Sequence, residues 1–527
     1  MMRTANGAKL RLAAAVLLAA SMVCGQATAD EGERLIAPAE FGDSKTMLWS
    51  PTLEWTLENP SHDGNPFDLV AKVTFRHEGG EEERVTEMFY AGEDTWKFRF
   101  TGTRTGEWTF ATQADGEDGT TKDDDLHGHG GAIVVSEHRD PQMRGFITHR
   151  GNKFARQVSS SDDLEGFLPA TYMNQRKFGN PEGYGWTDIT PTLTDPKVYE
   201  AYMDEVEAHG CNGVFVHVIN QWLKAHALSY DDHDSVNPDF ETFEALDSAI
   251  VRAHRRGLYV HLWAWGDNAR HRRWTPVGLP GGVNGKVDRR VQRYIAARLG
   301  PLPGWVMGYG FDLQEWTTEE QVGAWAQYMH EHMGWRHLLM ARARSHAALD
   351  VVSHAHCGHS YEDAVKNLKS DPKRPHHFGE RDCYGRSGYH TMDWTRRHLW
   401  RYTMAGGHSG HWGTWGNKEY PNPEQPKTHR TFWNRKQRLK LDMARANDLT
   451  DGFALATPDQ EHFVFYKEDT ESITMDLSDM DGSQPAIAVD TTREYREIDI
   501  GPLKPGKHTW KAPHKSDWAI AVGKFPG

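Results

Sequence analysis

The chain has 527 residues with 20 Trp and 21 Phe, and 11% of all residues are aromatic. This composition supplies enough apolar material for packed cores and excludes a disordered chain, and the length favours about two to four domains. The formal net charge of −14 argues against nucleic acid or an anionic membrane surface as the main partner.

The first 29 residues have the pattern of a secretory signal peptide. Three basic residues lie around the start of an apolar run, Leu12–Met22, which is too short to span a bilayer, and Ala27-Thr28-Ala29 forms a small-residue cleavage signal. We expect the mature chain to begin at Asp30 and to be secreted or periplasmic. An outer-membrane lipoprotein attached through Cys24 is the less favoured alternative, because the residue before that cysteine fits a lipobox poorly.

Residues 30–145 have a strand-like pattern. The segments Leu53–Leu57 and Gly106–Phe110 alternate apolar and polar residues, and turn residues such as Asp63-Gly64-Asn65-Pro66 separate the strands. Alternation at a period of two with frequent turns predicts an N-terminal β-sandwich.

From about Gly166 apolar strand-like runs alternate with longer helix-like stretches. Eight such repeats within residues 146–450 predict a (β/α)8 TIM barrel, and a last long helix is expected near residues 434–447. The predicted strands are Phe167–Met173, Gly213–Ile219, Leu258–Trp263, Trp305–Phe311, His337–Ala341, Leu349–Ser353, Pro375–Gly379 and Tyr402–Gly407.

Alternation returns in residues 451–527, for example in Phe463–Tyr466, Ile473–Leu477 and Trp518–Val522. This pattern predicts a small C-terminal β-sandwich. The fold class is therefore α/β, with a (β/α)8 barrel between N-terminal and C-terminal β-sandwich domains.

The active site of a parallel barrel lies at the carboxyl ends of its strands, so the polar and aromatic residues after each predicted strand are candidates. Carboxylates can act on a glycosidic bond, amides and histidines can hold hydroxyls, and indole rings can stack on sugars. The substrate-binding candidates are Asn220, Trp222, Trp265, Asp267, His354, His356, Arg381, His408, His411, Trp412 and Trp415, and the carboxylates Asp312, Glu315 and Glu380 follow the fourth and seventh strands. This set favours a polysaccharide or oligosaccharide substrate.

Three of these strand ends resemble those of the clan A glycoside hydrolases. Residues 305–316 (WVMGYGFDLQEW) match the fourth strand, residues 374–380 (RPHHFGE) match the seventh, and residues 404–412 (MAGGHSGHW) resemble the glycine-rich eighth. The resemblance implies that Glu315 is the acid/base and Glu380 the nucleophile of a retaining enzyme. The family usually has Asn where this chain has Gln314, and some relatives use an Asp at the fourth strand, so Asp312 competes with Glu315.

The order of domains is also similar to that family. Asn65-Pro66-Phe67 and Gly106-Glu107-Trp108-Thr109 resemble an uncharacterised β-sandwich that precedes many of these barrels, and residues 453–522 resemble a small sandwich described there as collagen-binding-like. The resemblance implies a secreted glycoside hydrolase, and the histidines and arginines near the strand ends hint at an acidic or sulfated sugar such as an algal galactan. A non-catalytic carbohydrate-binding or adhesion protein is the alternative, which the two glutamates argue against.

A metal-dependent enzyme is the third hypothesis for the function. His354-x-His356-x-x-His359 has spacing compatible with zinc, but metal-dependent barrels place an H-x-H at the first strand, where Tyr172-Met173-Asn174 stands. We therefore expect His354 or His356 to contact substrate, with no metal or other cofactor. Arg342 and Arg344 could equally meet anionic groups or form ion pairs, and Arg381 or Arg374 could keep the nucleophile ionised. The sugar, its linkage and the oligomeric state stay open.

Overall fold

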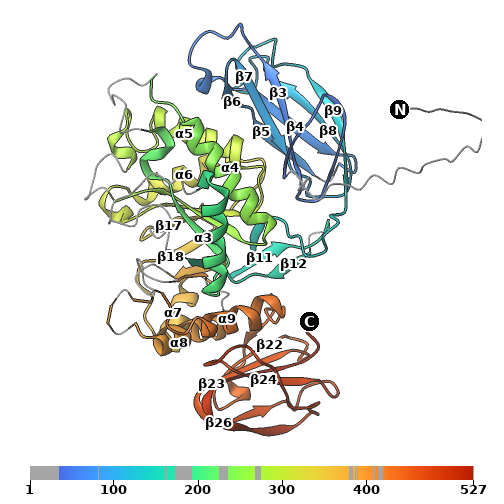
Figure 1. Cartoon of the computed structure of the whole chain (residues 1–527), viewed down its shortest axis with the longest axis vertical. Helices are drawn as coiled ribbons and strands as arrows, with labels where there is room; N and C mark the ends of the chain where they lie inside the picture. The colour runs from blue at the N-terminus through green and yellow to red at the C-terminus, as the bar shows by residue number, and fades with distance from the viewer. Residues whose placement is uncertain are drawn as a thin grey trace, which may run out of the picture. The chain divides into compact units, whose positions relative to one another are not determined.

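The computed structural model describes residues 35–525, apart from positions 81, 161–162, 173–192, 225–234, 268–274, 379–383, 386, 389, 407–409 and 414–418. Residues 35–527 form one compact unit (Figure 1). The predicted signal peptide lies outside the described residues. Within the described part, no helix has the length and apolar character needed to cross a membrane.

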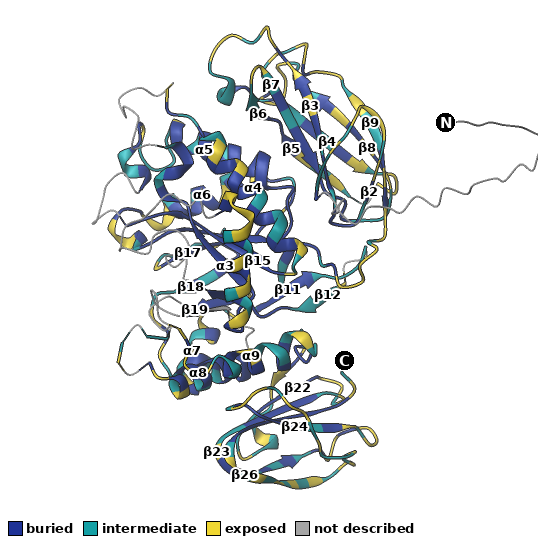
Figure 2. Cartoon of the chain, in the orientation of Figure 1, coloured by how far each residue is buried: buried dark blue, intermediate teal, exposed yellow. Residues whose placement is uncertain are grey.

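Eight parallel strands close into a barrel, as the sequence predicts, and the first strand pairs with both the second and the eighth. In Figure 2 the visible barrel strands are mostly coloured as buried. The strands are β13 (Ala170–Tyr172), β14 (Gly213–His217), β15 (Tyr259–Trp265), β16 (Trp305–Gly310), β17 (Leu339–Arg342), β18 (Val351–His354), β19 (His376–Phe378) and β20 (Gly410–Trp412).

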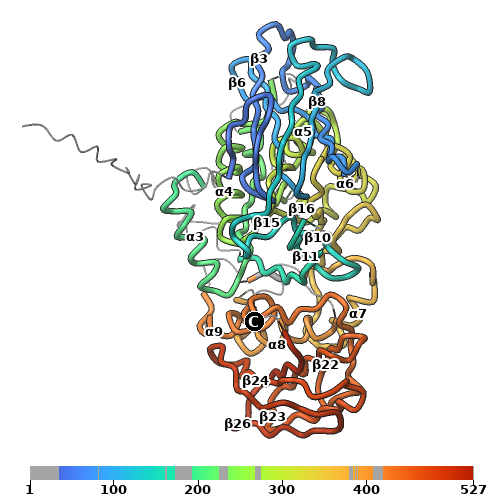
Figure 3. The backbone as a smooth tube through the Cα atoms, turned by 90° about the vertical axis from the view of Figure 1, so that its right-hand side faces the viewer, coloured from blue at the N-terminus to red at the C-terminus, as the bar shows by residue number. Residues whose placement is uncertain are grey.

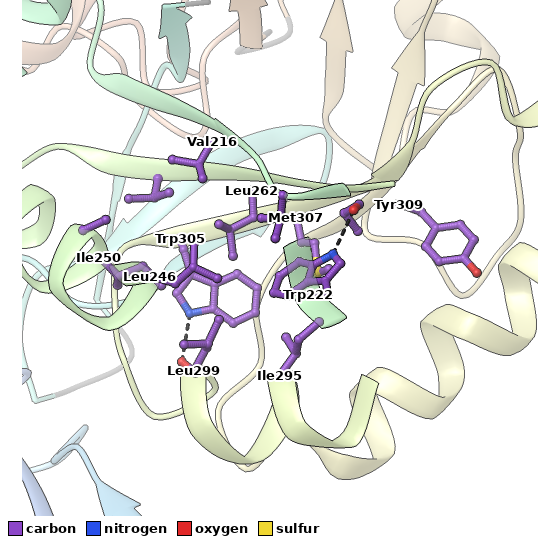
Figure 4. Close-up of a cluster of buried hydrophobic side chains, with 14 of the residues drawn as sticks. Val216, Trp222, Leu246, Ile250, Leu262, Ile295, Leu299, Trp305, Met307 and Tyr309 are labelled. Atoms are coloured by element: carbon purple, nitrogen blue, oxygen red, sulfur yellow. Dashed lines mark hydrogen bonds between the residues drawn. The ribbon is translucent and has the colours of Figure 1, made fainter. Parts of the chain in front are cut away.

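Helices cover the outside of the barrel. Their apolar faces pack on outward strand residues: Leu246 and Ile250 of the second helix approach Leu262, and the indole of Trp305 donates a hydrogen bond to Leu299 O at 2.9 Å (Figure 4). The helices are α3 (Pro196–Ala208), α4 (Phe240–Arg255), α5 (Lys286–Leu299), α6 (Glu319–His332), α7 (Tyr361–Ser370), α8 (Met392–Met404) and α9 (Glu424–Arg430).

Local sequence fixes where these helices begin. Asp239 precedes α4 and its carboxylate accepts from Thr242 N at 2.9 Å, and Thr318 and Gln321 form a reciprocal capping box at the start of α6. Such caps satisfy backbone N–H groups that have no partner within the helix. Large side chains, including Phe215, Tyr259 and Trp263, fill the barrel interior, so the lumen is a packed core rather than a pore.

The barrel departs from the predicted pattern in three places. Residues 343–350 join β17 to β18 without a helix. The eighth strand predicted at Tyr402–Gly407 is wrong, because Trp400, Tyr402 and Met404 belong to α8, where the ring of Trp400 stacks on that of Tyr466 at 5.0 Å. The helix expected near 434–447 is also wrong: α9 continues only through a π turn, η8 (Thr431–Arg435), and Gln437 has a left-handed φ of 47°.

The end of this last helical segment binds the residues just before the first barrel strand. The amide of Asn434 donates to Leu168 O at 3.1 Å and its oxygen accepts from Leu168 N at 3.1 Å. The Lys153 ammonium donates to Leu441 O at 2.7 Å. A three-stranded sheet thus docks beside the first barrel strand; it comprises β10 (Ile147–Arg150), β11 (Lys153–Gln157) and β12 (Leu164–Gly166).

The N-terminal segment forms two sheets, ordered β1-β3-β7-β6 and β2-β9-β8-β4-β5, around one aromatic core. Within that core the ring of Trp55 stacks on that of Phe98 at 5.1 Å. The strands are β1 (Ile36–Pro38), β2 (Gly42–Met47), β3 (Thr52–Glu58), β4 (Lys72–His77), β5 (Glu83–Glu87), β6 (Phe89–Gly92), β7 (Thr95–Phe100), β8 (Gly106–Gln113) and β9 (Gly130–Ser136). This confirms the expected sandwich architecture.

The C-terminal segment is a six-stranded antiparallel sheet, ordered β21-β22-β23-β26-β24-β25. Its core contains Phe465 and Met475 from the two halves of one long strand, which has register shifts between Lys467 and Ser472, so the sheet wraps around its own apolar side chains. The strands are β21 (Ala444–Arg445), β22 (Phe453–Ala456), β23 (Phe463–Asp476), β24 (Ala486–Asp490), β25 (Ile498–Asp499) and β26 (Lys507–Val522).

A buried charge cluster joins β7 to the barrel helices. Arg99 donates to both carboxylate oxygens of Asp247 at 2.8 Å and to Arg298 O, and Arg298 donates to Asp247 Oδ2 at 2.9 Å. Burial alone would raise the pKa of Asp247, but Arg298 and Arg99 outweigh it and hold that pKa below its usual value. The carboxylate is therefore charged and compensated at neutral pH.

Removing this carboxylate leaves two buried guanidinium groups without their shared anion. We expect Asp247→Ala to lower the free energy of unfolding by about 3–5 kcal/mol. Asp393→Ala, which removes an exposed helix-surface carboxylate paired with Arg396, should cost about 1 kcal/mol at most. Urea unfolding followed by circular dichroism measures both; equal losses would contradict the role of the cluster.

Candidate active site

Three of the predicted site carboxylates meet at the carboxyl ends of β15 and β16. One oxygen from each of Asp267, Asp312 and Glu315 lies within 4.8 Å of the others. Asp267 is buried, Asp312 is half-buried, and Glu315 is exposed on a short 3-10 turn, η6 (Leu313–Glu315). The three carboxylates therefore differ in solvent exposure along one side of the barrel mouth.

Arg342, the last residue of β17, supplies the positive charge beside these carboxylates. Its Nη2 donates to Asp312 Oδ1, and its guanidinium carbon lies 5.2 Å from the centroid of the Phe311 ring. The Arg342 side chain is only 3% exposed, and that of Asp312 is 19% exposed. Of the two possibilities that the sequence left open for Arg342, an ion pair is what the structure shows.

The backbone is unusual at the same rim. Ile219, Asp312 and Ala343 follow β14, β16 and β17 and have left-handed φ values of 56°, 43° and 60°. Such values are uncommon outside glycine, and for a β-branched residue such as Ile219 they are a genuine outlier. Backbone strain of about 1–3 kcal/mol per residue persists where the surroundings enforce it, and it concentrates at functional sites. This feature independently points to the same end of the barrel.

Aromatic and imidazole rings support the rim from below. Phe311 packs at 4.8 Å against both His217 and Trp263, and deeper in the lumen the rings of His261 and His377 lie 5.2 Å apart. Burial lowers the pKa of His261 to about 3, so this ring is neutral at physiological pH. The sequence analysis did not predict His217 and His377. Alternation along β14 and β19 could have identified them, because both occupy inward-facing positions of their strands.

Two tryptophans predicted to stack on sugars lie in the core instead. Trp222 is fully buried and its indole donates to Ala264 O at 2.8 Å (Figure 4). Trp265 is 2% exposed and belongs to the same cluster between strands and helices. Other side chains cover both rings, so neither offers an exposed face to a ligand. Asn220, on the turn η2 (Ile219–Leu223), remains partly exposed near the rim.

His354 points away from the barrel lumen. Its Nε2 lies 2.8 Å from His376 Nδ1, and its ring stacks on Phe378 at 5.1 Å, on the face of β19 that meets Tyr402 of α8. His376 Nε2 must donate to Asp371 O at 2.9 Å, so its Nδ1 accepts from His354. The expectation that His354 contacts substrate is therefore wrong: alternation along β18 directs its side chain to the helices.

The other members of the histidine motif do not share this partner. His359 accepts from Arg401 Nη1 at 3.1 Å, and His356 is exposed in the loop after β18. Arg374 also differs from expectation: its guanidinium binds Asp371 at 2.7 Å and His346 O at 2.7 Å, before β18 and β19 begin, so it lies at the opposite end of the barrel from the rim.

The remaining predicted residues lie outside the described part of the chain. These are Glu380, Arg381, His408 and Trp415, together with the side chains of His411 and Trp412. The backbone of β20 is described, and Trp412 pairs with Thr171 of β13.

The histidine pair gives the fold a defined pH dependence. Burial, and then His376, lowers the pKa of His354 to about 4, whereas an unfolded histidine titrates near 6.5. The unfolded chain therefore takes up the proton first, and stability present above pH 6.5 is lost as the pH falls towards 4. When the pH is lowered from 7.5 to 5, the free energy of unfolding of His354→Gln should fall by about 1–2 kcal/mol less than that of the wild-type protein.

Urea midpoints at the two pH values test this expectation. His356→Gln, which replaces an exposed histidine two residues away, is the matched control and should keep the wild-type dependence. An unchanged dependence in His354→Gln would contradict the assignment.

Comparisons with known proteins bear on the fold. A family described as a domain of unknown function, DUF5060, matches residues 46–115, which lie in the N-terminal sandwich. A search of curated proteins finds no match.

Among solved structures, a Bacteroides vulgatus protein assigned as a glycoside hydrolase has 16% identity and a TM-score of 0.66, and the match covers 91% of this chain and 100% of that one. A family 5 glycoside hydrolase from the same organism has 13% identity and a TM-score of 0.53, with 72% of this chain and 93% of that one covered. At these identities the likeness establishes the architecture that this chain shares with glycoside hydrolases.

Proposed function

We propose that this protein is a secreted, retaining glycoside hydrolase that cleaves a polysaccharide or oligosaccharide. The observation that carries the proposal is the convergence of Asp267, Asp312 and Glu315 at the carboxyl ends of β15 and β16. Glycosidic cleavage needs carboxyl groups at this place in a barrel, one to protonate the leaving oxygen and another across the sugar ring. The glycoside hydrolases that share the architecture support the same reaction class.

Glu315 suits the acid/base role better than Asp312. An acid/base must reach the glycosidic oxygen and exchange a proton with it. One oxygen of Asp312 is already held by Arg342, whereas Glu315 is exposed at the mouth. In this assignment the Asp312–Arg342 pair fixes the base of the site, and the buried Asp267 keeps its proposed role as an acceptor of hydrogen bonds from sugar hydroxyls.

Glu380 is the proposed nucleophile. It follows β19, the seventh strand, and Glu315 follows the fourth. The Glu380 carboxylate would attack the anomeric carbon while Glu315 protonates the departing oxygen; water would then release the sugar from the enzyme ester, with Glu315 acting as base. A retaining enzyme needs its two carboxyl groups about 5–5.5 Å apart, and an inverting one about 6.5–9.5 Å.

Reducing-end release from neutral and sulfated plant and algal polysaccharides tests the activity. We expect Glu315→Gln to lower turnover by about 10²–10⁴-fold with a smaller loss on aryl glycosides that have good leaving groups, and Glu380→Ala to be inactive until azide is added. Glu319→Gln, on the exposed first turn of α6, is the matched control and should keep wild-type activity.

Three outcomes would change the proposal. If Asp312→Asn shows the leaving-group dependence and Glu315→Gln does not, the acid/base is Asp312. An inverted anomeric product by NMR overturns the retaining mechanism. Saturable binding of a polysaccharide without any new reducing end favours the non-catalytic carbohydrate-binding alternative.

The proposal of secretion has its own test. We expect N-terminal sequencing of exported protein to begin at Asp30, since Ala27 and Ala29 occupy the small-residue positions of the cleavage signal. A lipid-modified N-terminus at Cys24 would contradict this and place the protein on a membrane surface.

A further inference from the structure

A cavity lies at the opposite end of the barrel from the carboxylates. It has a volume of about 360 Å³, and its wall includes Asn212 and Gly257, just before β14 and β15, and Gly166 at the end of β12. Figure 3 shows β10 and β11 beside the barrel at this end. Five arginines contribute to the wall, against two carboxylates: Arg144, Arg156, Arg256, Arg430 and Arg435.

Two of these arginines are neutralised within the protein. Arg144 donates to Glu165 at 2.8 Å. Arg256 binds Glu200 at 3.0 Å and Asp204 at 2.8 Å and also donates to Glu207. Both carboxylates of the cavity wall are therefore already bound by arginines. The other three arginines of the wall, Arg156, Arg430 and Arg435, account for its remaining positive charge.

Arg156 is the central cation of this wall, and it makes no salt bridge to the described residues. It is 6% exposed, its Nη1 donates to Gly257 O at 3.1 Å, and its guanidinium lies 4.7 Å from the ring of Phe167. Its Nε and Nη2 have no hydrogen-bond partner within the described part of the chain. Burial lowers the pKa of Arg156 to about 10, so the group stays charged at neutral pH. Glu165 lies opposite Arg156 on β12 and opposes this shift, but it is bound by Arg144 and makes no hydrogen bond to Arg156. A buried charge without a hydrogen-bonded counter-ion is costly.

Arg430 is in a similar position. It donates to Cys211 O, and its nearest carboxylate oxygen is Glu207 Oε1 at 3.7 Å. Burial lowers its pKa to about 10 as well. Arg435 is 61% exposed, with Glu207 at 4.0 Å. The partly buried Arg430 and the exposed Arg435 therefore share Glu207, which Arg256 already binds.

The polar lining continues into an adjoining cavity of about 170 Å³, which shares Arg156 and Arg256. His254 lines it, is 3% exposed, and has no hydrogen-bond partner for either ring nitrogen among the described residues. Burial lowers the pKa of His254 to about 3, so its ring is neutral. A neutral imidazole adds one donor and one acceptor to the same wall.

We propose that this cavity binds a sulfate or phosphate group through Arg156 and Arg430. A planar guanidinium donates two parallel hydrogen bonds to an oxyanion, and two nitrogens of Arg156, Nε and Nη2, lack acceptors among the described residues. The volume exceeds what one tetrahedral ion needs and falls in the range of about 300–1,000 Å³ typical of small-ligand sites. The ligand is therefore the ion itself or a small ester that carries it. The site lies away from the proposed catalytic rim and does not depend on the proposed reaction.

Calorimetric titration of the full-length mature protein tests binding directly. Inorganic sulfate and inorganic phosphate are titrated at ionic strength held constant with sodium chloride. We expect saturable binding of one ion per chain, weakened at least about tenfold in Arg156→Gln and in Arg430→Gln. Arg76→Gln removes an exposed arginine paired with Glu83 and should bind as wild type. Tighter binding of galactose 6-sulfate or glucose 6-phosphate than of the ions identifies an ester as the ligand; no gain identifies the free ion.

Thermal melting separates a ligand-binding arginine from a structural one. Without sulfate, Arg156→Met should melt no lower than wild type, because the change removes an uncompensated buried charge and keeps an apolar stem on Phe167. Sulfate should raise the melting temperature of wild type saturably and leave that of Arg156→Met unchanged. If Arg156→Met fails to fold, Arg430→Gln carries the comparison. Non-saturable heats in wild type, or an equal response in the arginine variants, overturns the proposal.

Discussion

Closure of the parallel sheet is the constraint on which the rest of this molecule depends. Each of the eight strands pairs in parallel with its two neighbours, and β13 closes the ring with β14 and β20, so all carboxyl ends meet at one rim. Asp267, Asp312 and Arg342 lie at the ends of three neighbouring strands, and they meet because these strands end at the same rim. The same closure gathers the amino ends at the other side, where arginines from β11, α9 and the turn after it surround a single cavity.

Charge compensation divides the buried polar groups into two kinds. Asp247 sits between Arg99 and Arg298, and Asp312 binds Arg342, so each carboxylate has a cation that offsets its loss of water. Arg156 lacks such a partner among the described residues. The unmet hydrogen-bonding capacity of Arg156 distinguishes it from these paired carboxylates and is the reason for proposing an anion site there.

The sequence predicted the barrel and both β-rich flanks because long apolar runs with regular spacing are a strong signal. The prediction failed where a strand was very short or where one pattern fitted both a strand and a helix. The true eighth strand, Gly410–Trp412, is too short to stand out, while Trp400, Tyr402 and Met404 fit an alternating strand as well as the helix they occupy. The carboxylates near β15 and β16 followed directly from strand polarity. The orientation of His354 could not be predicted in this way, because a shift of one residue along a strand decides whether a side chain faces the lumen or the helices. The burial of Trp222 and Trp265 could not be predicted either, because the sequence alone does not tell which segments cover a ring.

The contacts of Asn434 with Leu168 have a consequence for how the chain folds. Leu168, two residues before the first barrel strand, is bound by Asn212 just before the second strand and by Asn434, which follows the eighth. The last of these contacts can form only late in synthesis, and its loop-closure entropy is high. The N-terminal sandwich, by contrast, has all its strand partners within residues 36–136. During translation it can form its own sheets while the barrel is still growing, and then offer Arg99 as a fixed docking point for α4 and α5. The order of the domains along the chain is thus also an order in time.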